Sequence, residues 1–548
     1  MQAASNKPSA AFLFAAYLCA VGMGVLAMLL ARAYQAGFSG ADEPSHFLNG
    51  YFIAHYLSHQ FGANPMGAAT EFYVHYPKIS IGHWPPAYYG FLGLLFLVLP
   101  ATIPVAFAIN VLVAALPALG IAAALTLLSG RRAALVGVLV YALAPLALEG
   151  QAMFMVDQPL SACLMAATAV WIAYAAQPGW GKALGFAALA ALAVLIKGNG
   201  WLIALVPVFH IVLTGDWKRL LDVKLLVAAA LSAAIVVPWY MLTAKIAADG
   251  FNYQAGLDYA SKALGANLLA LVHNLTPVGA LLALFAVVME WRERHASPQR
   301  WRLVAGILSL LLATLALQSL VPVDIVDRYM APALPAVVVL ALLGAERLAR
   351  RLVTPGRPVA GPLVVGVLGA VMAVPGLLHL AEREPKADTG VARVARELGA
   401  SGQPSVTVID GAAGSEGAFI ADMAIQDPAL HSYVIRASKL LADSNFMGSS
   451  YILKYGDAKQ VQAELRRLGV QHVVVVLARN VAAYPHSSQL RDALARSDSG
   501  FRLRERIAHK YRPGTTEVYD AVGTVVPDIA AVRDLGIPAK ATNIVKLQ

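Results

Sequence analysis

The residues of this chain that could do chemistry are a few acids, histidines and cations that stand beside long apolar runs. The first group is Asp42-Glu43-Pro44-Ser45-His46. Paired acids with a histidine can hold a divalent cation such as Mg²⁺, Mn²⁺ or Zn²⁺, or they can remove a proton from a hydroxyl group. An acid before a proline also caps helices, so spacing alone leaves Glu43 open between a helix cap and a functional residue.

A third acid, Asp157, stands at the end of an apolar run and is followed by Gln158-Pro159. It could cap the next helix. An ionisable side chain at membrane depth is costly unless it faces a wet cavity or a cation, and this favours a functional role. The predicted ligands of a divalent cation are therefore Asp42, Asp157 and His46.

Cations form the second kind of candidate. Lys197 interrupts an apolar run just before Gly198, and Arg328 is followed by Tyr329. Such cations could snorkel to lipid headgroups, or they could bind the phosphate of a lipid-linked substrate. The planar guanidinium group of Arg328 suits phosphate well, although Asp327 could merely neutralise it.

The segment Lys78 to Tyr89 adds His83, a further candidate, and the pair Pro85-Pro86. A second imidazole near Asp42 would strengthen a metal site. We expect the aromatic residues Trp84, Tyr88 and Tyr89 to anchor the chain at the level of the lipid headgroups.

The composition shows what kind of chain must position these residues. Of 548 residues, 58% are hydrophobic and 14% are charged, against about 25% charged residues in soluble proteins. The mean hydropathy is +0.63, which excludes a soluble enzyme and a disordered scaffold. The two cysteines, Cys19 and Cys163, lie in apolar runs and exclude a disulfide framework. Because cytoplasmic loops of membrane proteins accumulate Lys and Arg, the net charge of +10 does not indicate nucleic-acid binding.

The sequence therefore predicts a polytopic α-helical membrane protein with about eleven transmembrane helices, since a span needs roughly 20 apolar residues. The expected spans lie near 10–32, 102–129, 133–149, 158–176, 183–199, 201–215, 224–243, 268–290, 303–321, 330–346 and 361–381. If 85–100 lies along the membrane surface, all the strongly basic loops fall on one side, which the positive-inside rule makes the cytoplasm. The loop 33–101 and the tail after Arg383 then face outward.

The tail predicts a small α/β domain outside the membrane. Val406–Ile409, Tyr433–Ile435 and His472–Leu477 are typical of strands, and Lys459–Leu468 of an amphipathic helix. The glycines of 410–417 lack the spacing of a dinucleotide-binding loop and indicate a turn. We expect a transmembrane domain over 1–382, which includes juxtamembrane helices in the loop 33–101, and an extracytoplasmic domain over 383–548.

These motifs, in this order, resemble the C-type membrane glycosyltransferases (GT-C), specifically the protein O-mannosyltransferase and aminoarabinose-transferase branch. The resemblance covers about residues 10–350. The matching marks are Asp42-Glu43-Pro44, Pro85-Pro86, Asp157 with Pro159, Lys197-Gly198, and Arg328-Tyr329 followed by Pro332 and Pro335. Relatives often place a basic residue just before the two prolines, where this chain has Trp84.

The resemblance implies transfer of a sugar from a polyprenyl-phosphate donor to a lipid, glycan or protein acceptor on the outer face of the cell membrane. Asp42 would be the general base or a metal-bound carboxylate, with Glu43 and Asp157 supporting the site. Residues implied to bind the lipid phosphate are Lys197, Arg328, Tyr329, His83 and Lys78.

Two other functions stay open at the level of sequence. One is an envelope polysaccharide ligase or polymerase with a polyprenyl-diphosphate donor, which would need more outward cations than the sequence offers. The other is a lipid or solute transporter. Transporters usually show repeat symmetry, and this sequence has no internal repeat.

Overall fold

The computed structural model describes residues 7–248, 251, 253–352, 360–444, 450–479 and 484–535. It divides into two compact units. The first, which we call the helical unit, comprises Met1–Leu30, Ala108–Met241 and Phe251–Arg383. The second, the mixed unit, comprises Ala31–Phe107, Leu242–Gly250 and Glu384–Gln548.

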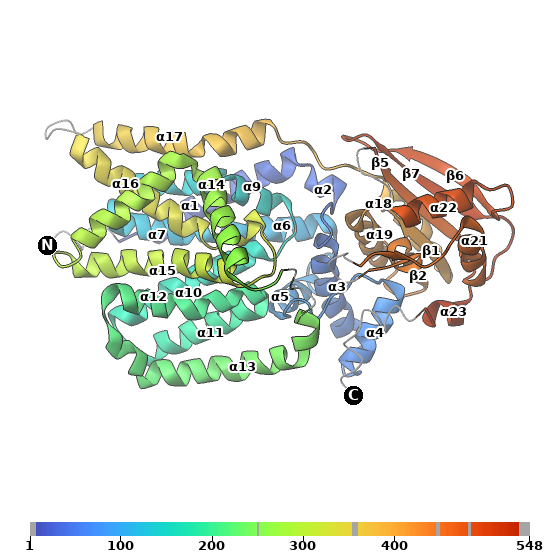
Figure 1. The fold of residues 1–548 in the computed structure, drawn as a ribbon, viewed down its shortest axis with the longest axis horizontal. Helices are drawn as coiled ribbons and strands as arrows, with labels where there is room; N and C mark the ends of the chain where they lie inside the picture. The colour runs from blue at the N-terminus through green and yellow to red at the C-terminus, as the bar shows by residue number, and fades with distance from the viewer. Residues whose placement is uncertain are drawn as a thin grey trace. The chain divides into compact units, whose positions relative to one another are not determined.

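The helical unit is a bundle of long apolar helices (Figure 1). Its elements are α1 (Ala10–Leu30), α7 (Pro117–Ser129), α8 (Arg131–Leu143), α9 (Pro145–Ala152), α10 (Asp157–Ala176), α11 (Trp180–Ile196), η1 (Gly198–Ala204), α12 (Leu205–Thr214), η2 (Trp217–Leu221), α13 (Val223–Ala248), α14 (Leu257–Arg292), α15 (Pro298–Leu320), η3 (Asp327–Met330), α16 (Leu334–Leu352) and α17 (Ala360–Ala381). Helix α6 (Ile103–Ala114) crosses the boundary between the two units, and so does the end of α13, whose residues from Leu242 onward belong to the mixed unit.

Seven helices of the described chain are long and apolar enough to cross a membrane, or eight if α8 and α9 form one bent span. This confirms a multi-span membrane protein. Helices α11 and α12 are shorter apolar helices, and α16 has Glu346, Arg347, Arg350 and Arg351 near its end. The number of eleven spans stays a prediction.

Prolines interrupt two of the predicted spans. The run 102–129 has a short interruption between α6 and α7 before Pro117 but still counts as one of the seven spans, whereas the run 133–149 bends by 57° between α8 and α9 at Pro145. Proline lacks an N–H and interrupts helical hydrogen bonding. Asparagine side chains bind backbone groups near the second break: Asn274 Oδ1 accepts from Leu146 N (2.8 Å), and Asn110 Nδ2 donates to the carbonyl oxygen of Met153 (3.1 Å). An apolar surrounding demands such partners.

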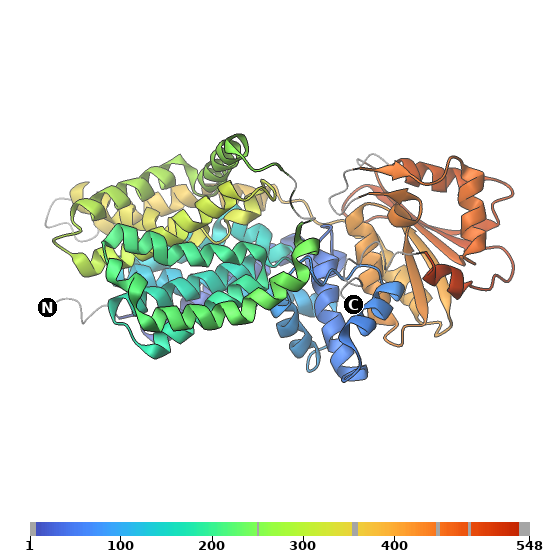
Figure 2. The same cartoon turned by 60° about the horizontal axis from the view of Figure 1, so that its bottom comes forward.

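The mixed unit combines short helices of the first loop with an α/β tail (Figure 2). Its elements are α2 (Ala33–Ala36), α3 (Glu43–His59), α4 (Pro65–His75), α5 (Ala87–Phe96), α18 (Val391–Gly399), β1 (Ser405–Asp410), α19 (Ala413–Gln426), β2 (Ser432–Arg436), α20 (Ala437–Leu440), β3 (Ala442–Asp443), β4 (Ile452–Leu453), α21 (Ala458–Arg467), β5 (His472–Ala478), α22 (Pro485–Ala495), β6 (Phe501–Ala508), β7 (Gly514–Ala521) and α23 (Ile529–Arg533).

A five-stranded sheet with the order β2-β1-β5-β7-β6 forms the centre of the tail. Strand β1 is parallel to β2 and β5, whereas β7 is antiparallel to β5 and β6. The three predicted strands are present as β1, β2 and β5, and the predicted helix as α21. The pair β6 and β7 was not predicted from the sequence. The location of this fold outside the membrane stays a prediction.

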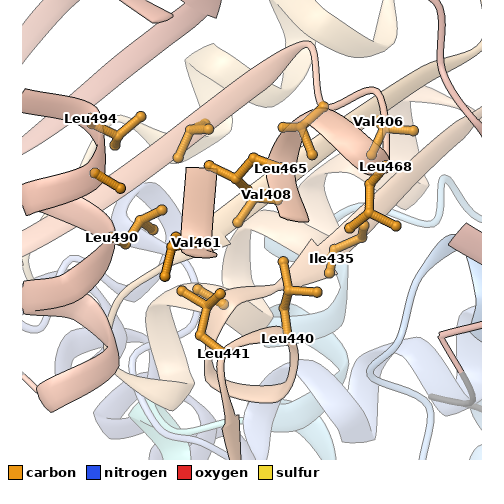
Figure 3. Packing of buried hydrophobic residues seen from close by; sticks show 14 of the residues in the cluster. Val406, Val408, Ile435, Leu440, Leu441, Val461, Leu465, Leu468, Leu490 and Leu494 are labelled. Atoms are coloured by element: carbon orange, nitrogen blue, oxygen red, sulfur yellow. The ribbon is translucent and has the colours of Figure 1, made fainter. Parts of the chain in front are cut away.

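Alternation of side chains along the strands gives the sheet two buried faces. Val406 and Val408 of β1 pack with Leu465 of α21 and Leu490 of α22 (Figure 3). Thr407 and Ile409 point to the opposite face and are fully buried as well. A strand that is buried on both faces has a nearly continuous apolar sequence. This pattern allowed β1 to be predicted.

The first loop packs against this tail within the mixed unit. Tyr51 in α3 donates to the carbonyl oxygen of Ala424 in α19 (2.9 Å). Tyr76 donates to Asp427 Oδ2 (2.6 Å) just beyond the same helix. The helices of the first loop therefore share a folded unit with residues more than 300 positions later in the chain. The domain boundaries expected from the sequence stay a prediction.

Close helix packing in the helical unit leads to the first test. A Cβ atom added at Gly344 in α16 would overlap the carbonyl oxygen of Leu282 in α14, whereas one added at Gly366 in α17 would meet nothing within 4 Å. We expect Gly344→Ala to destabilise the protein by about 1–3 kcal/mol, because backbone cannot move aside easily. Gly366→Ala should change stability by less than about 0.5 kcal/mol. Thermal unfolding in detergent measures both, and equal midpoints would contradict the packing described here.

Candidate functional site

A buried ion pair joins two of the candidate residues in the helical unit. Lys197 Nζ lies 2.5 Å from Asp157 Oδ1, and the two side chains are 8% and 6% exposed. Asp157 is the first residue of α10, where a negative charge is favourable, and its cap position is held by Val156. Lys197 is the extended residue between α11 and η1. Since α10 and α11 are packed neighbours that run in opposite directions, the start of one meets the end of the other.

Two further candidates lie beside this pair. Lys197 Nζ is 4.5 Å from the ring centroid of Tyr329, and the guanidinium carbon of Arg328 is 5.8 Å from the same ring. Ser161 Oγ of α10 donates to the carbonyl oxygen of Ala331 (2.9 Å), which fixes the segment that follows Tyr329. The structure thus brings Asp157, Lys197, Arg328 and Tyr329 together. We call these four residues the Lys197 cluster.

The charges of the Lys197 cluster suit an anion. Lys197 is paired with one carboxylate, and both Lys197 and Arg328 lie within about 6 Å of the ring of Tyr329, so the cluster holds two cations and one acid. In the described part of the chain, Asp157 Oδ2 is buried and has no hydrogen-bond partner. A buried polar atom without a partner is costly. A ligand that supplies a hydroxyl group to this oxygen and a phosphate to the two cations would satisfy all of these groups.

The candidates of the first loop are in the mixed unit. Asp42 is half-buried and directly precedes α3. The side chain of Lys78 packs against helix α19, because a Cβ atom added at Gly417 of that helix would be 2.8 Å from Lys78 Cε. Burial, and next the nearby Arg436, lower the pKa of Lys78 to about 7, while the charges of Glu416 and Asp42 oppose this shift. Near neutral pH the ammonium group of Lys78 therefore loses its proton, and with it its charge, easily.

Glu43 has a different kind of surroundings. Its carboxylate is fully buried and accepts hydrogen bonds from Ser39 N (3.1 Å) and Gly40 N (2.7 Å). Lys386 Nζ of the tail lies 3.0 Å from Glu43 Oε2 and also donates to the carbonyl oxygen of Gly37 (3.3 Å). The pair of Glu43 with Lys386 therefore fixes the turn that precedes Asp42. Sequence analysis missed Lys386, although a lysine just after the last apolar run could have drawn notice.

His46 and His83 lie among aromatic residues. His46 Nδ1 is 2.7 Å from the hydroxyl group of Tyr89, and the His46 and Trp84 rings are 4.5 Å apart. His83 is packed edge to face against Trp84. Tyr88 and Tyr89 are 4% and 0% exposed, so both rings are packed inside the protein, and their expected place at the level of the lipid headgroups stays a prediction. The metal role of His46, Asp42 and Asp157 stays a prediction.

A different set of side chains has the spacing of metal ligands. Within the described ranges, the group of three that meets this condition is Asp410, Glu416 and His486, all buried in the tail. The glycines of 410–417 predicted a turn. Nothing in the sequence connects this segment with His486, which lies about 70 residues later.

Comparisons with known proteins agree with this architecture. The family model described as dolichyl-phosphate-mannose-protein mannosyltransferase matches residues 83–242. No curated protein matches the sequence. Among solved structures, ArnT from Cupriavidus metallidurans bound to undecaprenyl phosphate is similar at 14% identity and a TM-score of 0.56, covering 93% of this chain and 98% of that one.

A second similar structure is the archaeal oligosaccharyltransferase AglB from Archaeoglobus fulgidus in complex with an inhibitory peptide and a dolichol-phosphate. It has 13% identity and a TM-score of 0.50, covering 85% of this chain and 69% of that one. The arabinofuranosyltransferase AftD from Mycobacteria has 13% identity and a TM-score of 0.50, with 94% and 42% covered. The resemblance to the GT-C glycosyltransferases predicted from the sequence is confirmed, and the chain has their fold.

The pair of Glu43 and Lys386 gives the second test. Lys386→Met leaves the buried Glu43 carboxylate without its lysine, which should destabilise the protein by about 3–5 kcal/mol. The double variant Glu43→Gln/Lys386→Met removes both charges and should be more stable than Lys386→Met alone. Thermal unfolding in detergent of four proteins, the wild type, Glu43→Gln, Lys386→Met and the double variant, measures this coupling. Additive effects of the two substitutions would show that the two side chains do not interact.

Proposed function

We propose that the chain is an integral membrane glycosyltransferase of the cell membrane that moves a sugar from a polyprenyl-phosphate donor to an acceptor hydroxyl group on the outer face. The observation that supports this most strongly is the Lys197 cluster, in which two cations and a partly unsatisfied buried carboxylate lie at the end of a bundle of apolar helices. The fold and the matched family model support the same class of reaction.

The chemistry of the transfer explains the two cations. The acceptor oxygen attacks the anomeric carbon of the sugar, and the bond between this carbon and the phosphate oxygen breaks. Negative charge grows on the departing polyprenyl phosphate, where fixed cations stabilise the transition state most. Lys197 and Arg328 have this role in the proposal, and Asp157 holds Lys197 in place before the donor binds.

The acceptor hydroxyl group must lose its proton during the attack. Asp42 is assigned as the general base, since it is a half-buried carboxylate whose position is set by the turn that Glu43 and Lys386 stabilise. An alternative use of Asp42 is to bind a divalent cation together with Asp157 and His46. Lys78 and His83 of the same loop, with Tyr329, are proposed to contact the donor phosphate or its sugar.

The third test removes the guanidinium group of the Lys197 cluster. We expect Arg328→Gln to lower the turnover of a labelled polyprenyl-phosphate sugar by about 100–1,000-fold, the usual effect of removing one group that stabilises a developing oxyanion. Arg294→Gln is the matched control, because Arg294 stacks on Trp291 at a helix end of the same unit. If Arg328→Gln and Arg294→Gln have the same turnover in membranes, the proposed role of the Lys197 cluster is wrong.

The fourth test uses the pKa of Lys78. With a pKa of about 7, Lys78 is charged below this pH and neutral above it, so kcat/KM for the donor should fall as the pH rises through 7. Lys78→Arg should remove this fall, since arginine stays charged. Identical pH profiles of the two enzymes would contradict a role for Lys78 in donor binding.

The ionised lysine also lowers the free energy of unfolding. This loss of stability is complete below pH 7 and disappears as the pH rises toward 10.5, the ordinary pKa of lysine.

A further inference from the structure

A group of buried polar residues lies at the carboxyl end of strand β1 in the tail sheet and has no part in the proposed transfer. Asp410 is the last residue of β1, Glu416 is in the first turn of α19, and His486 is in the first turn of α22. From β1 the chain crosses to β2 on one side, whereas β5 pairs with β1 on the other. In sheets of this kind, the carboxyl ends of the strands at such a reversal form a ligand site.

The geometry of the three side chains matches metal coordination. One ligand atom from each of Asp410, Glu416 and His486 lies within 4.8 Å of the other two, and the residues are 1%, 0% and 1% exposed. His486 Nε2 is 3.5 Å from Asp410 Oδ1. Two ligands of a tetrahedral Zn²⁺ ion, each about 2.1 Å from the metal, are about 3.4 Å apart. Small side-chain adjustments would therefore bring all three atoms to one ion.

The orientation of His486 is set by its other nitrogen. His486 Nδ1 is 2.8 Å from the hydroxyl oxygen of Tyr451, and this oxygen also accepts from the backbone N–H of His486 (3.1 Å). His486 Nε2 is buried and has no hydrogen-bond partner in the part of the chain that the structure describes. In metal sites, one ring nitrogen of a histidine binds the metal, and a hydrogen bond to the other nitrogen fixes the orientation of the ring. His486 has this arrangement, with Nδ1 at Tyr451 and Nε2 toward the carboxylates.

The charges favour a cation at this point. Glu416 is paired with Arg436, at 2.8 Å between Glu416 Oε2 and Arg436 Nε, and also accepts from Ser438 N (3.0 Å) and Ser438 Oγ (2.6 Å), so the unbalanced negative charge is that of Asp410. Asp410 accepts from Ser487 Oγ (2.8 Å), but no lysine or arginine of the described chain forms an ion pair with it. A buried carboxylate that lacks a cation is unfavourable. A divalent cation between Asp410, Glu416 and His486 would supply the missing positive charge.

We propose that Asp410, Glu416 and His486 bind a divalent metal ion, with Zn²⁺ favoured by one imidazole and two carboxylates. The ion would join the end of β1 to the starts of α19 and α22. A Cβ atom at Gly414 would overlap the carbonyl oxygen of Ser39, so the start of α19 lies directly against the turn that leads to Asp42. The metal therefore has a structural role in holding that turn.

The experiment measures Zn²⁺ binding to the full chain in detergent. After removal of metals with a chelator, the protein is titrated with Zn²⁺, and its metal content, thermal unfolding and X-ray absorption spectrum are recorded. We expect one tightly bound ion, a higher midpoint of unfolding, and a spectrum with one imidazole and oxygen ligands but no sulfur. Because binding is measured without any sugar donor, a failure of this proposal is distinguishable from a failure of the proposed glycosyltransferase activity.

Two variants and one control locate the ion. His486→Ala and Asp410→Asn should each weaken Zn²⁺ binding by at least 100-fold. His472→Gln is the matched control, since His472 forms a pair with Asp520 on the same sheet (2.8 Å) and should leave binding unchanged. If His486→Ala does not fold, the Zn²⁺ affinity of Asp410→Asn and the X-ray absorption spectrum of the wild-type protein test the proposal instead. Wild-type protein that binds no Zn²⁺, or Zn²⁺ affinity that is equal in wild type and Asp410→Asn, would overturn the proposal.

Discussion

The ion pair of Lys197 and Asp157 is the constraint on which the helical unit depends. Taking either charge out of water alone would cost several kcal/mol, so the start of α10 and the end of α11 must bring the two side chains together. The proline break near α9 and the amide of Asn110 that binds the following backbone serve the same arrangement. The pair does not satisfy every polar atom, because Asp157 Oδ2 lacks a hydrogen-bond partner among the described residues. An unsatisfied buried oxygen is consistent with a site that binds a polar ligand.

Glu43 shows how a structural acid differs from one in a binding site. Its carboxylate accepts from two backbone N–H groups and from Lys386, and it is completely buried. Such saturation leaves little for a substrate to bind. Asp42, the adjacent residue, is half-buried and is placed by this network. Two neighbouring acids in one motif therefore differ in their surroundings: Glu43 holds the turn, whereas Asp42 is the acid that we propose as the general base.

The sequence alone predicted a multi-span helical membrane protein and the strands β1, β2 and β5. It also singled out the members of the Lys197 cluster, because a charge inside an apolar run is rare and conspicuous. It could not predict Lys386 or the pairing of Asp410 with His486, since these contacts join segments far apart in the chain. The strands β6 and β7 were missed for another reason. Strand β6 lies at the sheet edge, and its apolar residues Phe501, Leu503 and Ile507 alternate with Arg502, Arg504 and Arg506. The period-two pattern of a strand was therefore present in the sequence and was overlooked.

The central claim is that Lys197 and Arg328 receive the phosphate of a polyprenyl carrier. An experimental structure of the protein with bound polyprenyl phosphate tests it most directly. We predict that the phosphate oxygens lie within hydrogen-bonding distance of Lys197 Nζ and of the Arg328 guanidinium group, with Lys197 turned at least partly away from Asp157. A phosphate bound elsewhere, with the Lys197–Asp157 pair at its present 2.5 Å, would contradict the account.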